Sequence, residues 1–210
     1  MQSEIIYDEI FDAQEHFRLI LDSMARPGKI NVIPDLDIRM TAGISKASTL
    51  IAFSLLNTDA SFCAIGELSN DIEEFITLHT TAKIETLQKA DFVFVKGDQS
   101  AGFIAELKIG TLPYPEDSAT IVVDVLNISI DETADSIQLN LKGPGVKTIE
   151  TVYVTGLNHA ILDAVREQNY EFPLGIDLVL TDLENNMICI PRSNDFTYEL
   201  AETDNQPYYN

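Results

Sequence analysis

The chain has 210 residues, with 34 Asp and Glu against 13 Lys and Arg, and a formal net charge of −21 at pH 7. This balance disfavours binding to nucleic-acid phosphates or anionic membranes, because both need a basic protein surface. The composition, 45% hydrophobic and 22% charged, is ordinary for a globular domain. A chain of this length buries enough surface to fold without metals or disulfides.

No window has the length and apolar character of a membrane-spanning helix. Met1 to Tyr7 also lacks the basic and long apolar regions of a secretory signal. We therefore expect a cytoplasmic protein. Cys63 and Cys189 are expected to be buried free thiols in a reducing compartment, and a disulfide between them is the less favoured alternative.

Apolar spacing predicts alternating helices and strands, the pattern of an α/β protein. The first helix is expected at 12–24, with Asp12 as its N-cap and Arg26-Pro27-Gly28 as its end. The further predicted elements are helices at 45–56, 71–78 (capped by Ser69 or Asn70), 100–107 and 157–166, strands at 61–65, 91–95, 119–125 and 136–141, and a hairpin of strands 177–181 and 187–190. The strand at 136–141 alternates, as an edge or one-face strand does.

Loops are expected at 110–116, which contains two prolines, and at the Gly143-Pro144-Gly145 turn. We expect one α/β domain over residues 1–196. The remaining residues, 197–210, form an acidic stretch without Lys or Arg, and we expect a mobile tail there.

The sequence contains no self-sufficient catalytic or metal-binding motif. There is no Cys-x-x-Cys, no His-x-x-x-His, no glycine-rich phosphate fingerprint and no Gly-x-Ser-x-Gly. Asp131, Glu132 and Asp135 are interpreted as solvated loop charges, and no metal or cofactor is expected. The segment 143–147 could present a backbone amide and a cation to a phosphate, but a plain turn is the favoured interpretation.

Each histidine has a structural and a functional interpretation. His16 and His159 lie in predicted helices, where a packing or surface role is favoured. His79 ends a helix, where a protonated side chain would suit the helix dipole, and Thr80 could bond it or a ligand.

The predicted hairpin brings Asp177 and Arg192 to the same end of its two strands. Their pairing is either a structural salt bridge or part of a surface that a ligand or partner reads, and the sequence leaves both open.

Several segments in register resemble the PhnH family, the H subunit of the bacterial carbon–phosphorus lyase system. The strongest are PLGIDLVLTD (173–182) and ICIPRSN (188–194). The others are 12–18, 24–28, 55–61, 78–80, 110–120 and 141–146. Two positions depart from the family pattern, Ala60 in place of Thr and Ser118 in place of Gly. The resemblance covers about residues 8–196.

The resemblance implies a three-layer α/β/α sandwich with a mixed sheet, similar to the fold of pyridoxal-phosphate-dependent transferases but without that cofactor. It implies a subunit that works with the G, I and J subunits. That complex, an α-D-ribose 1-methylphosphonate 5-triphosphate synthase, joins a phosphonate to C1′ of ATP ribose and releases adenine. The family assigns its H subunit no chemistry of its own. A homodimer is expected for the isolated chain.

The leading interpretation is therefore a subunit without independent catalysis. The candidate functional or interaction residues that match family motifs are Arg18, His79, Thr80, Glu116, Asp177 and Arg192. Pro27, Gly28 and Gly175 are expected to be architectural. The alternative is an enzyme or ligand-binding protein that holds ATP or a phosphonate in its own cleft, for which Arg18, Arg26, His79 and Arg192 would have to converge. A standalone pyridoxal phosphate enzyme is a weaker alternative.

Overall fold

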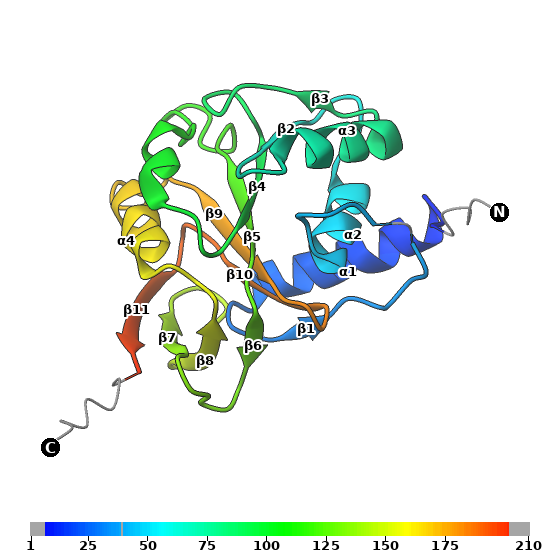
Figure 1. The fold of residues 1–210 in the computed structure, drawn as a ribbon. Helices are drawn as coiled ribbons and strands as arrows, with labels where there is room; N and C mark the ends of the chain where they lie inside the picture. Colours follow the sequence, from blue (N-terminus) through cyan, green and yellow to red (C-terminus); the bar gives the residue numbers. More distant parts are fainter. Residues whose placement is uncertain (1–6, 39, 202–210) are drawn as a thin grey trace, which may run out of the picture.

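The computed structural model describes residues 7–38 and 40–201 (Figure 1). Its helices are α1 (Phe11–Ala25), α2 (Lys46–Leu55), α3 (Ser69–Thr80) and α4 (His159–Gln168), with one 3₁₀ helix, η1 (Ala101–Glu106). The strands of the larger sheet are β1 (Asn31–Val32), β2 (Ser61–Ala64), β3 (Lys83–Ile84), β4 (Phe92–Lys96), β5 (Thr120–Asp124), β9 (Asp177–Thr181) and β10 (Asn186–Ile190). Those of the smaller sheet are β6 (Asn127–Ser129), β7 (Ile137–Lys142), β8 (Glu150–Thr155) and β11 (Asp195–Leu200).

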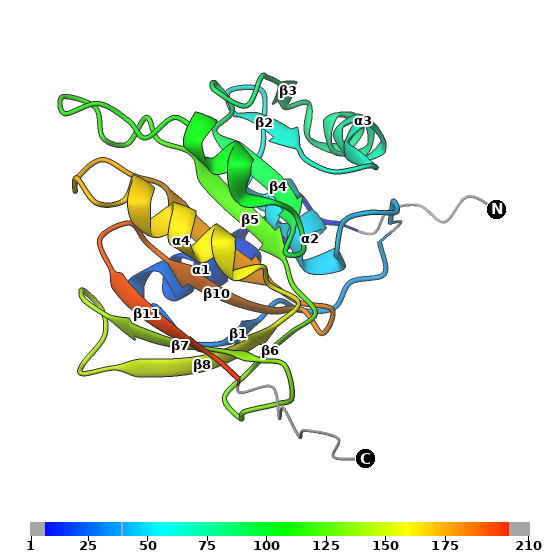
Figure 2. The same ribbon diagram turned by 60° about the vertical axis from the view of Figure 1, so that its left-hand side comes forward.

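The larger sheet forms the middle layer of the fold (Figures 1 and 2). Its first face is covered by α1, α2 and α3. Its second face is covered by α4 and η1 together with the smaller, antiparallel sheet. The α/β class with a mixed sheet is thus confirmed, whereas the second outer layer is part helix and part sheet rather than helix alone.

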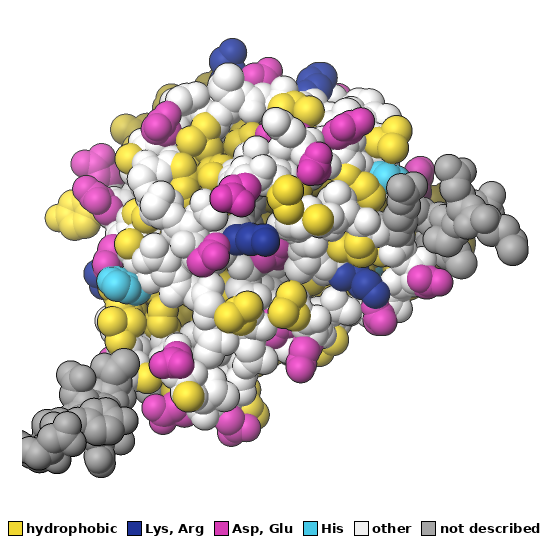
Figure 3. All heavy atoms as spheres, viewed as in Figure 1, with side chains coloured by type: hydrophobic (Ala, Val, Ile, Leu, Met, Phe, Trp, Pro, Cys, Tyr) yellow, Lys and Arg dark blue, Asp and Glu magenta, His cyan; other side chains and the backbone are white. Residues whose placement is uncertain are grey.

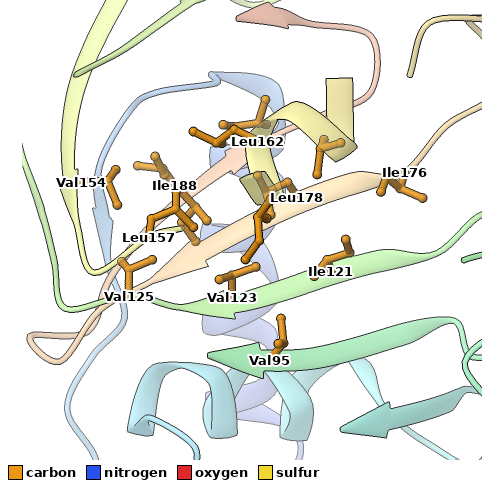
Figure 4. Close-up of a cluster of buried hydrophobic side chains, with 14 of the residues drawn as sticks. Val95, Ile121, Val123, Val125, Val154, Leu157, Leu162, Ile176, Leu178 and Ile188 are labelled. Atoms are coloured by element: carbon orange, nitrogen blue, oxygen red, sulfur yellow. The ribbon is translucent and has the colours of Figure 1, made fainter. Parts of the chain in front are cut away.

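Alternate residues of the central strands belong to two hydrophobic cores, one on each face of the larger sheet. The register places Val93, Ile121 and Leu178 in one row across β4, β5 and β9, and all three are buried on the second face. Figure 4 shows Ile121 and Leu178 within this cluster, near Leu162 of α4. The residues that follow them in sequence pack toward the helices of the first face. Each such side chain contributes about 1.5–3 kcal/mol through burial.

The topology of the larger sheet contains a reversal. The strand order is β1-β10-β9-β5-β4-β2-β3, in which β9, β5, β4, β2 and β3 run parallel. After β2 the chain crosses through α3 on the first face, whereas after β4 it crosses through η1 on the second face. Adjacent strands whose connections leave on opposite faces create a crevice at their carboxyl ends, which is where open α/β sheets bind ligands.

The structure corrects two predicted helix caps. The N-cap position of α1 is Ile10, and the carboxylate of Asp8, not of Asp12, accepts the N–H groups of Ile10 and Phe11 at 2.8 and 2.9 Å. Helix α3 begins at Ser69 after Leu68, without a side-chain cap, so neither Ser69 nor Asn70 serves as one. The second helix is capped by Ser45, whose side chain accepts from the backbone N–H of Ser48.

Other differences concern the type and extent of elements. Within the segment 100–107, residues Ala101–Glu106 form a 3₁₀ helix rather than an α-helix. Strand β7 shows the predicted one-face burial, but it lies inside the smaller sheet between β11 and β8 rather than at an edge. Residues 197–200, which we assigned to the tail, belong to β11. The rest of that expected tail, apart from residue 201, lies outside the described residues.

Both cysteines are free and buried, as predicted. Cys63 faces the core of the second face and Cys189 that of the first, so the sheet itself separates them. Burial raises the pKa of the Cys63 thiol to about 12 and also raises that of Cys189. Within the described residues, no helix combines the length and apolar character needed to cross a membrane.

Candidate functional site

Arg192 connects three loops at the amino-terminal edge of the parallel strands. Its Nη1 donates hydrogen bonds to Pro115 O at 2.7 Å, to Gly175 O at 3.3 Å and to the hydroxyl of Ser118. Its Nη2 lies 3.9 Å from Oδ2 of Asp177, whose Oδ1 accepts the backbone N–H of Arg192 at 2.9 Å. The hairpin therefore brings Asp177 and Arg192 together as predicted. The side chain of Arg192 is 18% exposed, and its Nη1 is engaged by groups of this chain.

Further motif segments meet beside this arginine. The side-chain amide of Asn194 donates to Pro144 O at 2.9 Å and thereby ties the 191–194 loop to the Gly143-Pro144-Gly145 turn. A cavity of about 390 Å³ lies between them, with Arg192 and Asp177 as its charged side chains. It is also lined by Met24, Ala25, Pro144, Gly145, Phe172, Pro191, Ser193 and Asn194.

Two motif glycines at this end have architectural roles. Gly28 has φ of 85°, and a Cβ there would lie 2.7 Å from Glu150 Cγ. Gly175 has φ of 137°, and a Cβ there would lie 2.3 Å from the Asn169 side chain, which bonds the backbone of Ile176. Only glycine fits such a backbone at this distance. The architectural interpretation of both residues is therefore supported.

His79 and Thr80 serve the end of α3. The Nδ1 of His79 lies 2.7 Å from Phe75 O, and its ring packs against Phe53 and Phe75 with centroid distances of 5.4 and 4.5 Å. Thr80 is buried, donates its hydroxyl to Ile76 O at 2.8 Å and accepts the N–H of Ala82 at 3.2 Å. These contacts support helix packing and termination.

The remaining candidates do not join these groups into one site. Arg18 is exposed on α1, beside Asp22 and Lys29, and Glu116 is exposed on the 110–118 loop. Arg26 forms an ion pair with Asp22. His79 belongs to α3, which packs on β2, whereas Arg192 follows β10, four strands away in the sheet. At a spacing of about 4.8 Å per strand, β2 and β10 are about 19 Å apart across the sheet. The convergence on an anion that the alternative interpretation required is not present.

A second site lies at the opposite, carboxyl-terminal edge of the parallel strands, where the topology reverses. Two adjoining cavities of about 320 and 370 Å³ share Gly43, Lys96 and Asp98 as lining residues. The first also borders Ile44, Ser45, Gly97, Asp124, Val125, Leu126, Gly156 and Leu183, and the second Ile65, Gly66, Glu67, Leu68, Ile72 and Gln99. We call this pair the switch-point crevice.

Asp124 fixes the floor of the switch-point crevice. Its Oδ2 accepts the backbone N–H of Ser45 at 2.7 Å. Its Oδ1 accepts the hydroxyls of Ser45, Ser48 and Thr181 at 2.6, 2.5 and 2.7 Å. This carboxylate joins the end of β5 to the start of α2 and the end of β9, so its role is to position these three elements.

The exposed charges of the crevice are Glu67, Lys96 and Asp98, and none of them forms an ion pair with another described residue. Together they offer one ammonium and two carboxylates beside apolar side chains. Such a lining suits a small molecule that carries both hydrogen-bond donors and acceptors. This site was not predicted from the sequence, although Lys96 directly follows one predicted strand and Asp124 lies near the end of another, which is where parallel sheets place ligand contacts.

Asp131, Glu132 and Asp135 are exposed in the loop between β6 and β7. Among residues 7–38 and 40–201, no group of three or more His, Cys, Asp or Glu side chains is arranged to hold a metal ion.

Comparison with known proteins identifies the family. Residues 6–197 match the family described as "Bacterial phosphonate metabolism protein (PhnH)". The chain belongs to the PhnH family. It is 33% identical over 189 residues to the α-D-ribose 1-methylphosphonate 5-triphosphate synthase subunit PhnH of Rhizobium meliloti (strain 1021), covering 89% of this chain and 90% of that relative. It is 24% identical over 180 residues to the putative C–P lyase subunit protein HtxG of Stutzerimonas stutzeri, covering 86% and 83%.

Membership of the PhnH family confirms the resemblance drawn from the sequence motifs. It links the chain to phosphonate metabolism, in which both of these relatives are described as subunits of larger assemblies. Of the segments that resemble PhnH, five contribute to the contacts of Arg192 or to the cavity beside it, a region that we call the Arg192 loops: 24–28, 110–120, 141–146, 173–182 and 188–194.

Proposed function

We propose that this chain is a subunit of a carbon–phosphorus lyase core complex, assembled with G, I and J subunits. In this complex it supports the transfer of a phosphonate to C1′ of ATP ribose with release of adenine, without catalysing a step by itself. The observation that carries the proposal is the match to the PhnH family over residues 6–197, together with relatives that are described as subunits.

The Arg192 loops support a role in assembly. Nη1 of Arg192 donates hydrogen bonds to Pro115, Gly175 and Ser118. Oδ1 of Asp177 accepts the backbone N–H of Arg192. These contacts hold the loops in a fixed arrangement. These residues therefore support a shaped surface at this end of the molecule.

Three further expectations belong to this proposal. The complex works in the cytoplasm, where ATP is available. The isolated chain forms a homodimer. Its fold is related to that of pyridoxal-phosphate-dependent transferases, with the cofactor lost.

The test is growth of the host on methylphosphonate as sole phosphorus source. Deletion of the gene for this chain is expected to abolish that growth and to leave growth on orthophosphate unchanged. A plasmid copy restores it. Normal growth of the deletion strain on methylphosphonate would refute the proposal.

The switch-point crevice favours a second candidate function, binding of ATP or a phosphonate by this chain itself. Its position at the carboxyl ends of parallel strands supports it. Its charge weighs against it, because Lys96 stands among Glu67, Asp98 and Asp124. Calorimetric titration with ATP and with methylphosphonate tests whether this chain binds either ligand. Saturable binding that Lys96→Glu weakens at least tenfold would establish the second function, and no binding at millimolar concentration would remove it.

A further inference from the structure

Two neighbouring loops expose large apolar side chains at the amino-terminal edge of the parallel strands. On the 110–118 loop, Leu112 is 74% and Tyr114 61% exposed. On the 169–176 loop, Tyr170 is 87% and Phe172 64% exposed. We call these four side chains the loop-tip surface. Figure 2 shows both loops projecting on the same side of the molecule, the first in green and the second in yellow-orange.

The loops that carry this surface are braced against each other. The backbone N–H of Gly175 donates to Ile109 O at 3.0 Å, and the guanidinium of Arg192 bonds a carbonyl of each loop. Within the first loop, Thr111 and Tyr114 exchange backbone hydrogen bonds of 3.0 Å in both directions. Loops that are already ordered lose less conformational entropy on binding, so their exposed side chains give more net affinity.

Exposed aromatic side chains on ordered loops are typical of binding hot spots. Tyrosine and other aromatic residues are enriched at the centres of protein interfaces. Large apolar groups that gather on a soluble protein mark interaction sites. The loop-tip surface combines these properties, and it lies beside the Arg192 loops where the family motifs meet.

The charge around this surface defines the partner. Glu116 and Asp117 on the first loop and Glu171 on the second are exposed. Neither loop contains Lys or Arg, and Arg192 is engaged below them. The whole chain has a net charge of −21, and Figure 3 shows acidic side chains distributed among apolar ones over one face. A second copy docked on a twofold axis would place these acidic groups against themselves. A basic partner surface complements them.

We infer that the loop-tip surface docks another subunit of the complex, one that presents apolar pockets within a basic surface. The inference rests on the proposed function and adds to it the face of this chain that the partner occupies. Tyr170 and Leu112 are the anchors that fill the pockets. Glu116, Asp117 and Glu171 pair with cations at the rim.

The test is co-expression of the tagged full chain with the G, I and J subunits, followed by affinity purification and native mass spectrometry. Leu112→Asp and Tyr170→Asp remove the apolar anchors at sites where the side chain is exposed, so folding is expected to survive. Ile10→Asp before α1 and Ile130→Asp after β6 are matched controls, because these side chains are 74% and 73% exposed at other places on the molecule.

We expect each loop-tip variant to reduce recovery of the partner subunits at least tenfold, and each control to stay within twofold of the wild type. We also expect wild-type recovery to fall at 0.5 M salt, because the rim pairs are exposed.

If the wild type recovers the subunits and both loop-tip variants recover them equally well, the docking surface is refuted while the proposed function stands. If the wild type recovers none, both fail. If the loop-tip variants convert an isolated dimer to a monomer in light scattering and leave subunit recovery unchanged, the surface joins two copies of this chain and the inference is refuted.

Discussion

Replacement of Arg192 by alanine tests the central physical claim about the motif-bearing end of the molecule. The guanidinium holds the 110–118 and 173–176 loops through Pro115 O and Gly175 O, and it faces Asp177. Its removal leaves two carbonyl groups and a hydroxyl without their donor, and a carboxylate that is 21% exposed without its counter-ion. The loss is therefore larger than for an exposed ion pair.

The magnitude follows from the contacts. A hydrogen bond to a charged group contributes about 1.5–3 kcal/mol, and breaking a buried ion pair costs about 3–5 kcal/mol. The Asp177 carboxylate keeps the 2.9 Å bond from the Arg192 backbone, and the charges are 3.9 Å apart, so the ion-pair part is reduced. We expect Arg192→Ala to lower the free energy of unfolding by about 3 kcal/mol, more than a hundredfold in the equilibrium constant.

Two variants calibrate this number. Arg192→Lys keeps the positive charge but loses the planar set of guanidinium donors, and we expect it to lower the free energy of unfolding by about 1.5 kcal/mol. Asp177→Asn keeps an oxygen for the backbone N–H, with an expected cost of about 1 kcal/mol. Urea unfolding measures all three, and hydrogen exchange should quicken at the amide of Gly175 in Arg192→Ala. A cost under 0.5 kcal/mol for Arg192→Ala with unchanged exchange would show that the loops do not depend on this residue.

Three other predictions concern the interior. Burial lowers the pKa of His16 below its usual 6.5, so the unfolded chain binds that proton more readily. The free energy of unfolding should therefore fall as pH drops through about 6.5. Measured by urea unfolding, it should fall less between pH 7 and 5.5 in His16→Leu than in the wild type. Equal decreases in the two proteins would contradict this prediction. With a pKa of about 12, native Cys63 should react with iodoacetamide at pH 8 more than a hundredfold more slowly than in urea, by mass spectrometry, and similar rates would exclude its burial. Asp124→Ala leaves three hydroxyls and the N–H of Ser45 without their shared acceptor. We expect it to lower the free energy of unfolding, measured in urea, by about 3 kcal/mol. A decrease under about 1 kcal/mol would contradict this expectation.

Local patterns sufficed for strands that are buried on both faces of the sheet. The runs at β5 and at the β9–β10 hairpin are apolar, β-branched and bounded by turns, and both were predicted. The strands β1 and β3 have two residues each and exist only through pairing with β10 and β2, so no local signal announces them. Strand β8 alternates apolar and polar residues along Glu150–Thr155, a usable signal that we did not apply.

The candidate sites divide in the same way. Asp177 and Arg192 could be placed together because a hairpin fixes their register within 15 residues of chain. The switch-point crevice could not be assembled from the sequence, because its walls come from segments between Gly43 and Leu183 and depend on the strand order. The predicted N-cap of α1, Asp12, lies two residues after the observed position, Ile10, because Asp8 and Asp12 are both good acceptors and tertiary context decides between them.

The most direct test of the account is purification of the tagged chain from cells grown on a phosphonate as sole phosphorus source, followed by native mass spectrometry. The account predicts that the chain is recovered with G, I and J subunits in a fixed ratio. Recovery of the chain alone, as a stable monomer or homodimer, would contradict it and direct attention to a ligand in the switch-point crevice.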